Sequence, residues 1–251
     1  GCVSLNRRPQ PPSPSDTRCY ISPTALLNRR HRVILGVTFL CGMQSEYYQR
    51  NLPHWHPAGA VLSLTARLHG SLPASVIAAW QAECDAEREL LDEPADPDIG
   101  HILQARQFVR FDALLAADTC GPHWLADPFL ANLLLDSLRR PAPEAYELLA
   151  ATVMSNHWHA VVVLAETPER PFIRTLQQLK AHVAREANRH LCRSGQFWAR
   201  ETYDHIVRDP WEKGIANAVN YVLHNPVKAG LCSTWEEWPH TWLKPDYRTK
   251  T

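Results

Sequence analysis

Apolar residues alternate with a period of two along several stretches of the chain, which predicts β-strands. Such stretches cover residues 59–69, 146–153 and 157–165, and a looser alternation covers residues 196–208. The dipeptide at 155–156 is Ser-Asn, and Asn tolerates the unusual dihedral angles of a tight turn. The second and third of these strands are therefore expected to form an antiparallel hairpin.

Other segments place their apolar residues at helical spacing. The segments predicted as helices are 74–91, 127–138, 171–192 and 209–224. The second and the last open with an Asp-Pro pair, in which the Asp caps the helix and the Pro takes its first position. Residues 102–115 fit neither period clearly. Strands and helices joined by short connections predict an α+β fold, in which helices cover an antiparallel sheet.

Composition narrows the class of protein only a little. The chain has 251 residues, enough for one domain with an extension, and its formal net charge is zero. The longest apolar run near its start, residues 33–43, is about half of the ~20 residues that a membrane span needs, so no membrane association is expected. Seven cysteines without a Cys-x-x-Cys pair favour a reducing cytoplasm over a disulfide framework.

Residues 1–42 differ in composition from the remainder of the chain. They contain a proline-rich stretch at 9–15 and a basic cluster at 29–32, which are typical of a disordered or polyproline-type segment. We expect the natural protein to start at Met43, so that residues 1–42 come from an over-extended reading frame. The alternative is a genuine flexible basic tail. Residues 43–251 are expected to form a single domain.

Charge is unevenly distributed although it sums to zero. Residues 83–98 contain eight acids and one Arg, whereas residues 170–208 contain eight Lys or Arg and three acids. A basic segment of this kind can hold a phosphate backbone even in a neutral chain. Two solvated helix faces of opposite sign would give the same pattern.

Two histidines stand two positions apart in the third predicted strand. Because side chains of a strand alternate between its faces, His157 and His159 share one face with Val161, and Trp158 points to the other. Two imidazoles fixed side by side make half of a site for a divalent metal. A lone His-x-His on a strand is more often a packing feature, so this pattern alone leaves both interpretations open.

A second His-Trp-His occurs at residues 54–56. Prolines flank it at positions 53 and 57, which predicts an extended loop rather than a central strand. We interpret it as a packing turn.

The last predicted helix offers groups that could complete a metal site. Tyr221 lies at the edge of its apolar stripe, and Asn225 follows four residues later on the same side. Hard ions such as Mg²⁺ or Mn²⁺ accept imidazole together with amide oxygen. Such a site could grip a phosphate oxygen while the Tyr221 phenol attacks. An edge tyrosine that only packs against its neighbours remains the alternative.

The order of these motifs resembles the single-tyrosine transposases that carry a His-hydrophobic-His (HUH) motif, of the insertion-sequence type. In particular it resembles the REP-associated tyrosine transposases, from about residue 47 onward. Ser155 departs from the pattern, because the family usually has Pro at this position. The segments that carry the resemblance are residues 50–57, 153–159, 179–180 with Asn188, 196–198, 203–209 and 221–231.

The resemblance implies a ferredoxin-like antiparallel sheet with the HUH motif on a central strand. It also implies that His157 and His159 are metal ligands, that Asn225 is the third ligand and that Tyr221 is the nucleophile. The substrate would be single-stranded DNA folded into a REP-like hairpin, cut through a 5′-phosphotyrosine intermediate. We expect a monomer or homodimer without an obligatory protein partner.

The basic segment supplies candidate DNA contacts. Cationic side chains bind phosphates, and an aromatic ring can stack on an unpaired base, although a core position is at least as common for a tryptophan. Two other functions stay open: a domesticated hairpin-binding module with little or no cleavage activity, and a metal-dependent phosphodiesterase that uses water. The candidate DNA contacts are Arg174, Lys180, Arg185, Arg189 and Trp198.

Overall fold

The computed structural model describes residues 45–49, 53–90, 97–117, 121–140, 144–207 and 213–250. The proposed start at Met43 and the expected extension 1–42 lie outside these residues and remain predictions. Strands β1 (Ser45–Gln49) and β2 (Pro53–Pro57) form a two-stranded antiparallel sheet. The expected loop around the second His-Trp-His was therefore wrong. Prolines at the ends of β2 are compatible with a strand that has only one neighbour, where a missing N–H is tolerated.

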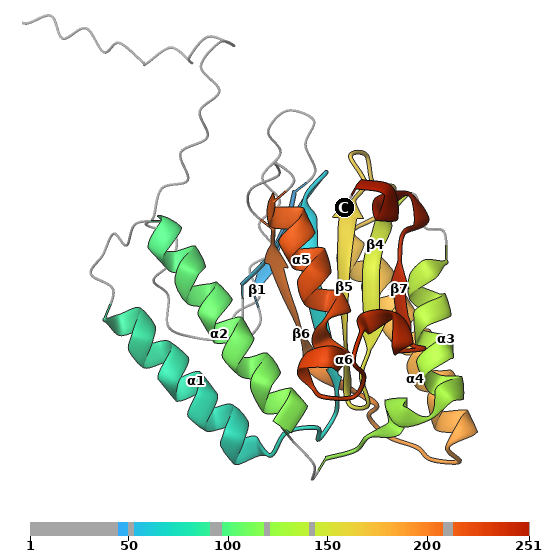
Figure 1. The fold of residues 1–251 in the computed structure, drawn as a ribbon. Coiled ribbons are helices and arrows are strands. Elements are labelled where there is room, and N and C mark those ends of the chain that lie inside the picture. The colour runs from blue at the N-terminus through green and yellow to red at the C-terminus, as the bar shows by residue number, and fades with distance from the viewer. Residues whose placement is uncertain are drawn as a thin grey trace, which may run out of the picture. The chain divides into compact units, whose positions relative to one another are not determined.

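The main sheet has five strands in the order β6-β3-β5-β4-β7, and every neighbouring pair is antiparallel. This confirms the α+β class with an antiparallel sheet. The strand that carries His157 and His159 is central, with two strands on each side of it (Figure 1). The strands are β3 (Val61–Leu68), β4 (Tyr146–Val153), β5 (His157–Leu164), β6 (Trp198–Ile206) and β7 (Thr241–Leu243).

Four of these strands and two helices follow one another as β-α-β-β-α-β, in the order β3, α3, β4, β5, α4 and β6. With β3 and β5 in the middle, this is the ferredoxin-like arrangement. Helix α3 (Pro128–Arg139) begins as expected, because the Asp127 carboxylate accepts from the Phe129 N–H at 2.8 Å. Helix α4 (Phe172–His190) confirms the third predicted helix.

Two helices stand between β3 and α3 in the chain and do not belong to this six-element unit. Helix α1 (Ala74–Glu89) was expected, whereas α2 (Pro97–Ala117) covers the segment with no clear period. The side chains that α2 buries include Phe108, Phe111 and Leu115, at spacings of three and four. A helical stripe is therefore present in the second half of α2, and an acid, Asp112, interrupts it.

The chain after β6 closes the fold. Helix α5 (Lys213–Leu223) packs on β4 and β5, and α6 (Asn225–Lys228) follows it after one residue. The expected start of α5 at residue 209 lies outside the described residues. Short 3-10 turns occupy Trp124–Ala126, Trp235–Glu237 and Pro245–Lys250. No helix in the described ranges combines the length and apolarity of a membrane span.

The two faces of the sheet are covered by different helices (Figure 1). On one face Trp158, Ala160 and Val162 enter the main core with residues of α3 and α4. On the other face Val161 packs with residues of α5. The alternation read from the sequence is therefore correct: the histidine face is the one that α5 shares with α2, and α3 and α4 lie across the sheet.

Candidate active site

The candidate site starts from a row of side chains that cross three strands on one face. In the register of β3 and β5, Thr65 lies opposite His159 and Arg67 opposite His157. Thr65 also lies opposite Tyr203 of β6. Cross-strand partners point to the same side, so the two histidines share a continuous polar and aromatic row with β3 and β6.

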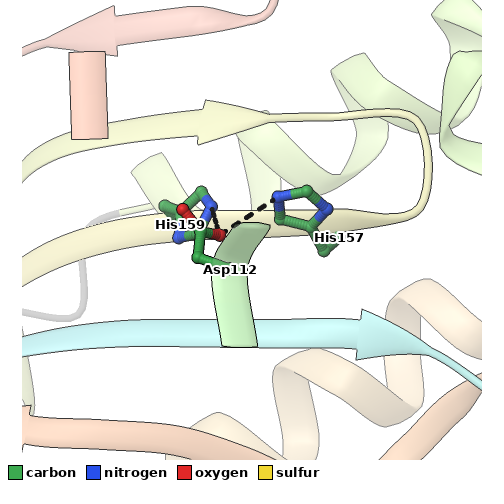
Figure 2. Close-up of side chains that lie close together, drawn as sticks. All are labelled: Asp112, His157 and His159. Atoms are coloured by element: carbon green, nitrogen blue, oxygen red, sulfur yellow. Dashed lines mark ion pairs between the residues drawn. The ribbon is translucent and has the colours of Figure 1, made fainter. Parts of the chain in front are cut away.

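Helix α2 brings a carboxylate to the two histidines. Asp112 Oδ1 lies 3.0 Å from His159 Nε2 and 3.7 Å from His157 Nε2 (Figure 2). All three side chains are buried, and their ligand-capable atoms lie within 4.8 Å of one another. Figure 2 shows the Asp112 carboxylate reaching from α2 toward both imidazoles of β5. A carboxylate and two imidazoles at such spacing are a donor set suited to a divalent metal.

The outer nitrogen of each imidazole is held by a neighbouring polar group. Asn156 Oδ1 lies 2.6 Å from His157 Nδ1, and Thr65 Oγ1 lies 2.7 Å from His159 Nδ1. Because the amide oxygen can only accept, His157 carries its proton on Nδ1 and presents Nε2 as a lone pair. Such bonds fix ring orientation in metal-binding histidines.

Two atoms at the centre of the cluster lack hydrogen-bond partners within the described part of the chain. They are Asp112 Oδ1 and His159 Nε2, both buried, and they face each other. A buried polar atom without a partner is costly, and these two lie 3.0 Å apart, so either a proton between them or a cation bound beside them would satisfy both. The donor set and these orphaned atoms together fit a divalent cation.

The protonation state of the cluster favours cation binding, because His157 is neutral and Asp112 is ionised. Burial lowers the pKa of His157 to about 3, and the neighbouring His159 adds to this effect. Burial would raise the pKa of the Asp112 carboxyl, but His159, His157 and the hydrogen bond from Tyr221 hold it well below its usual range. A neutral imidazole and an ionised carboxylate are the forms that metals bind.

Tyr221 of α5 reaches the same carboxylate from the other side. Its hydroxyl donates to Asp112 Oδ2 at 2.5 Å, and the Phe108 ring lies against it with centroids 5.7 Å apart. The Lys228 ammonium lies 3.7 Å from the centroid of the phenol ring. Burial and the Asp112 charge raise the pKa of Tyr221 well above its usual range, so the phenol is neutral. A potential nucleophile and the metal-capable cluster thus share one carboxylate.

Asn225 lies close to Tyr221, at the start of α6. It is the first residue of α6, it is buried, and its amide nitrogen donates to the Tyr221 carbonyl oxygen at 3.0 Å. Its amide nitrogen therefore joins α6 to the last turn of α5. The carboxylate of Asp112, which the sequence interpretation did not include, is a further potential ligand beside the two histidines.

The candidate DNA contacts lie away from this cluster. Arg174, Arg185 and Arg189 are exposed on α4, which covers the opposite face of the sheet. Lys180 points toward the sheet and donates to Thr202 Oγ1 at 2.9 Å. Trp198 is buried, and its indole N–H donates to the Lys180 carbonyl oxygen at 2.9 Å, so it packs in the core.

Sequence reasoning missed Asp112. The sequence does contain a sign of it. Phe108, Phe111 and Leu115 form an apolar stripe at helical spacing, and the acid Asp112 stands within that stripe. An acid on such a stripe is expected to be buried, and a buried carboxylate needs a cationic or hydrogen-bonding partner to offset its desolvation. The segment had no clear period as a whole, so the stripe was not recognised and its acid could not be assigned to a site.

Fold and site together define an α+β protein with a buried Asp-His-His cluster beside a tyrosine. The sequence is similar to a curated relative from Haemophilus influenzae, the "Putative REP-associated tyrosine transposase", with 27% identity over 114 residues. The match covers 42% of this chain and 63% of that protein, which is less than two thirds of its length. It supports the resemblance drawn from the motifs. No family model matches the sequence.

The chain is also similar to a solved structure that is described as a REP-associated tyrosine transposase bound to a REP hairpin. It is 16% identical, and the superposition covers 79% of this chain and 82% of that one with a TM-score of 0.44. A likeness this distant adds nothing to the fold derived above.

Proposed function

We propose that this chain is a transposase that cuts and rejoins single-stranded hairpin DNA, with Tyr221 as the nucleophile. The observation that carries the proposal is the shared carboxylate of Asp112. One of its oxygens faces His157 and His159, and the other accepts the Tyr221 hydroxyl at 2.5 Å. A phosphodiester that approached the histidines would therefore lie beside the phenol oxygen.

In the proposed reaction the Tyr221 oxygen attacks the scissile phosphorus. A bond forms between that oxygen and phosphorus, and the bond from phosphorus to the 3′-oxygen breaks. The phenol proton leaves along the hydrogen bond to Asp112, and the departing 3′-oxygen takes up a proton to become a hydroxyl. The result is a 5′-phosphotyrosine and a free 3′-end. Attack by a 3′-hydroxyl reverses these steps and rejoins the DNA without a nucleotide cofactor.

His157, His159 and Asp112 would hold a divalent ion, Mg²⁺ or Mn²⁺, with the Asn225 amide oxygen as the alternative third ligand. The bound ion would supply positive charge for a phosphate oxygen and would offset the Asp112 charge that opposes loss of the phenol proton. Thr65 and Asn156 would keep both imidazoles oriented. Two imidazole nitrogens with a carboxylate or amide oxygen form a ligand set that suits Mg²⁺ or Mn²⁺. Structural zinc sites, by contrast, are usually rich in cysteine sulfur.

One observation favours a second function. The Asp112 hydrogen bond and burial keep the Tyr221 phenol protonated in the described arrangement. A hairpin-binding module with little cleavage activity would have the same neutral phenol. A transposase, by contrast, must release that proton when substrate and metal bind.

The deciding experiment is incubation with end-labelled hairpin DNA carrying single-stranded flanks, in the presence of Mn²⁺. We expect a protein–DNA adduct that survives SDS and is absent in Tyr221→Phe. His157→Ala is expected to abolish cleavage while hairpin binding persists. Cleavage without an adduct would indicate a phosphodiesterase that uses water, and binding without cleavage would indicate the binding module. Equal loss of binding and cleavage in His157→Ala would mean that the histidines are structural.

A further inference from the structure

A cavity of about 330 Å³ lies beside the candidate active site, and the proposed reaction does not use it. It opens between α1 and strands β3 and β6. Its volume is at the lower end of the ~300–1,000 Å³ found for small-molecule sites, which is suitable for one nucleotide-sized group. The side chains that line it include Thr65, Arg67, Trp80, Phe111, Arg200 and Tyr203.

Irregular pairing at the sheet edge accompanies this cavity. The register of β3 with β6 shifts between Ala66, which lies opposite Thr202, and Leu68, which lies opposite Trp198. The residues of β6 between these partners include Arg200 and Glu201, and both line the cavity. Bulges re-aim side chains and often occur beside functional sites.

One wall of the cavity is aromatic. Trp80 of α1, Phe111 of α2 and Tyr203 of β6 form a mutual cluster, with ring centroids 4.8 to 5.8 Å apart. Such a wall offers a π surface for a planar group. Stacking of a nucleobase on aromatic side chains is the common way in which proteins hold unpaired bases.

A partly buried cation faces this wall. The Arg67 guanidinium lies 6.0 Å from the Phe111 ring and donates to the Ser71 hydroxyl at 3.3 Å. Burial lowers its pKa, and among the ion pairs of the described residues none includes Arg67. A half-buried guanidinium without a carboxylate is suited to an anionic or acceptor-rich ligand.

The cavity adjoins the candidate site, although His157, His159 and Asp112 do not line it. Arg67 lies directly opposite His157 on the same face of the sheet. Thr65 lines the cavity and also holds His159 through its hydroxyl. Phe111, in the aromatic wall, precedes Asp112 in α2. A DNA strand with its phosphate at the histidines would therefore place a neighbouring nucleotide at this cavity.

We propose that this cavity binds one unpaired nucleobase of the single-stranded DNA next to the cleaved bond. The base stacks on the wall formed by Trp80, Phe111 and Tyr203, and Arg67 donates to its acceptor edge or adjoining phosphate. This inference rests on the proposed function and adds a subsite to it. The subsite makes recognition depend on the flank as well as on the hairpin.

The test compares the affinity for a hairpin with single-stranded flanks and for the same hairpin without them. For the unaltered protein we expect flanks to tighten binding about tenfold or more. Arg67→Gln and Ile77→Trp, which fills the cavity, should bring that ratio close to one. Arg140→Gln, an exposed cation on the other layer, is the matched control and should keep the ratio. Failure to bind either DNA overturns the proposed function; an unchanged ratio in both cavity variants overturns only the subsite.

A second measurement does not depend on the stability of a variant. A fluorescent base analogue such as 2-aminopurine is placed at successive flank positions, and one position should change its emission strongly on binding. An abasic residue at that position should remove the flank contribution. Retained affinity with the abasic residue would mean that the cavity holds phosphate alone, which overturns the proposal of a base.

Discussion

Asp112 and Tyr221 lie 109 positions apart in the chain, yet the phenol hydroxyl donates to the carboxylate at 2.5 Å. The contact joins α2 to α5 directly above the histidine strand. It also links the two halves of the proposed chemistry, since the same carboxylate faces both imidazoles.

Asp112→Asn should abolish the stabilisation that Mn²⁺ gives to the protein. A bound ion present at about 100 times its Kd adds ~2.7 kcal/mol to the free energy of unfolding. We expect this gain in the unaltered protein and in Asn225→Ala, but not in Asp112→Asn, because the amide removes the charge. Thermal unfolding with and without Mn²⁺ measures it. Loss of the gain in Asn225→Ala, with the gain intact in Asp112→Asn, would assign the third ligand to Asn225.

Thr65→Val should weaken Mn²⁺ binding without disturbing the fold. The variant keeps the shape of the side chain but removes the hydroxyl that lies 2.7 Å from His159 Nδ1. Loss of such an orienting bond costs about 10–100-fold in metal affinity. Mn²⁺ titration by calorimetry gives the change directly. The control is Thr202→Val, which should bind Mn²⁺ normally. The Thr202 hydroxyl that it removes accepts a hydrogen bond from Lys180 on the opposite face of the sheet.

The two His-Trp-His segments should respond differently to substitution. His56 of β2 is buried and pairs with Asp204 of β6, away from the candidate site. His56→Ala should lower the free energy of unfolding by about 1–3 kcal/mol, because it leaves the Asp204 carboxylate with one partner fewer. Its Mn²⁺ stabilisation should persist, whereas His159→Ala should lose it. Denaturant unfolding with and without Mn²⁺ separates the two effects, and a common response would contradict the assignment.

Asp127 caps α3, and its removal should destabilise the fold in a pH-dependent way. Asp127→Ala should cost about 1 kcal/mol at neutral pH. Hydrogen bonding from His190 lowers the pKa of the Asp127 carboxyl below its ordinary value. A depressed pKa gives stability that is present above the unfolded pKa and is lost as pH falls through the folded one. The difference from the unaltered protein should therefore shrink in acid, as urea unfolding at several pH values will test.

Arg174→Gln should reduce the salt dependence of hairpin binding if α4 holds the DNA backbone. Each phosphate contact contributes about −0.9 to the slope of log K against log salt for duplex DNA. Arg185 and Arg189 both pair with Glu186, so their substitution should have smaller effects. Binding measured over a salt series gives the slope. An unchanged slope in Arg174→Gln would place the hairpin elsewhere on the molecule.

The sequence allowed prediction of those helices and strands that are determined by residues close to one another in the chain. The β4–β5 hairpin, the Asp-Pro start of α3 and the two faces of β5 all follow from residues close in the chain. Periodicity and capping depend on neighbours within a few positions, so they can be read directly.

Features that depend on distant partners escaped prediction. Whether the Pro-flanked segment at 53–57 forms a strand depends on its pairing with residues 45–49. The place of Asp112 depends on how α2 lies across β5, which no local pattern specifies. The basic residues of α4 looked close to the histidines in sequence, yet the sheet separates them. Proximity along the chain says little about which face of a sheet an element covers.

The position of α2 also governs access. His157 and His159 are only 2% and 1% exposed, and Asp112 covers them from α2. Access of a phosphodiester to the imidazoles therefore depends on the placement of Asp112 and of the turn of α2 that carries it. The apparent affinity for DNA is then the intrinsic affinity reduced by the fraction of molecules in the open form. Since α2 stands outside the six-element sheet unit, a shift of the turn that carries Asp112 would expose the imidazoles and leave the sheet intact, so α2 would control access to the proposed site.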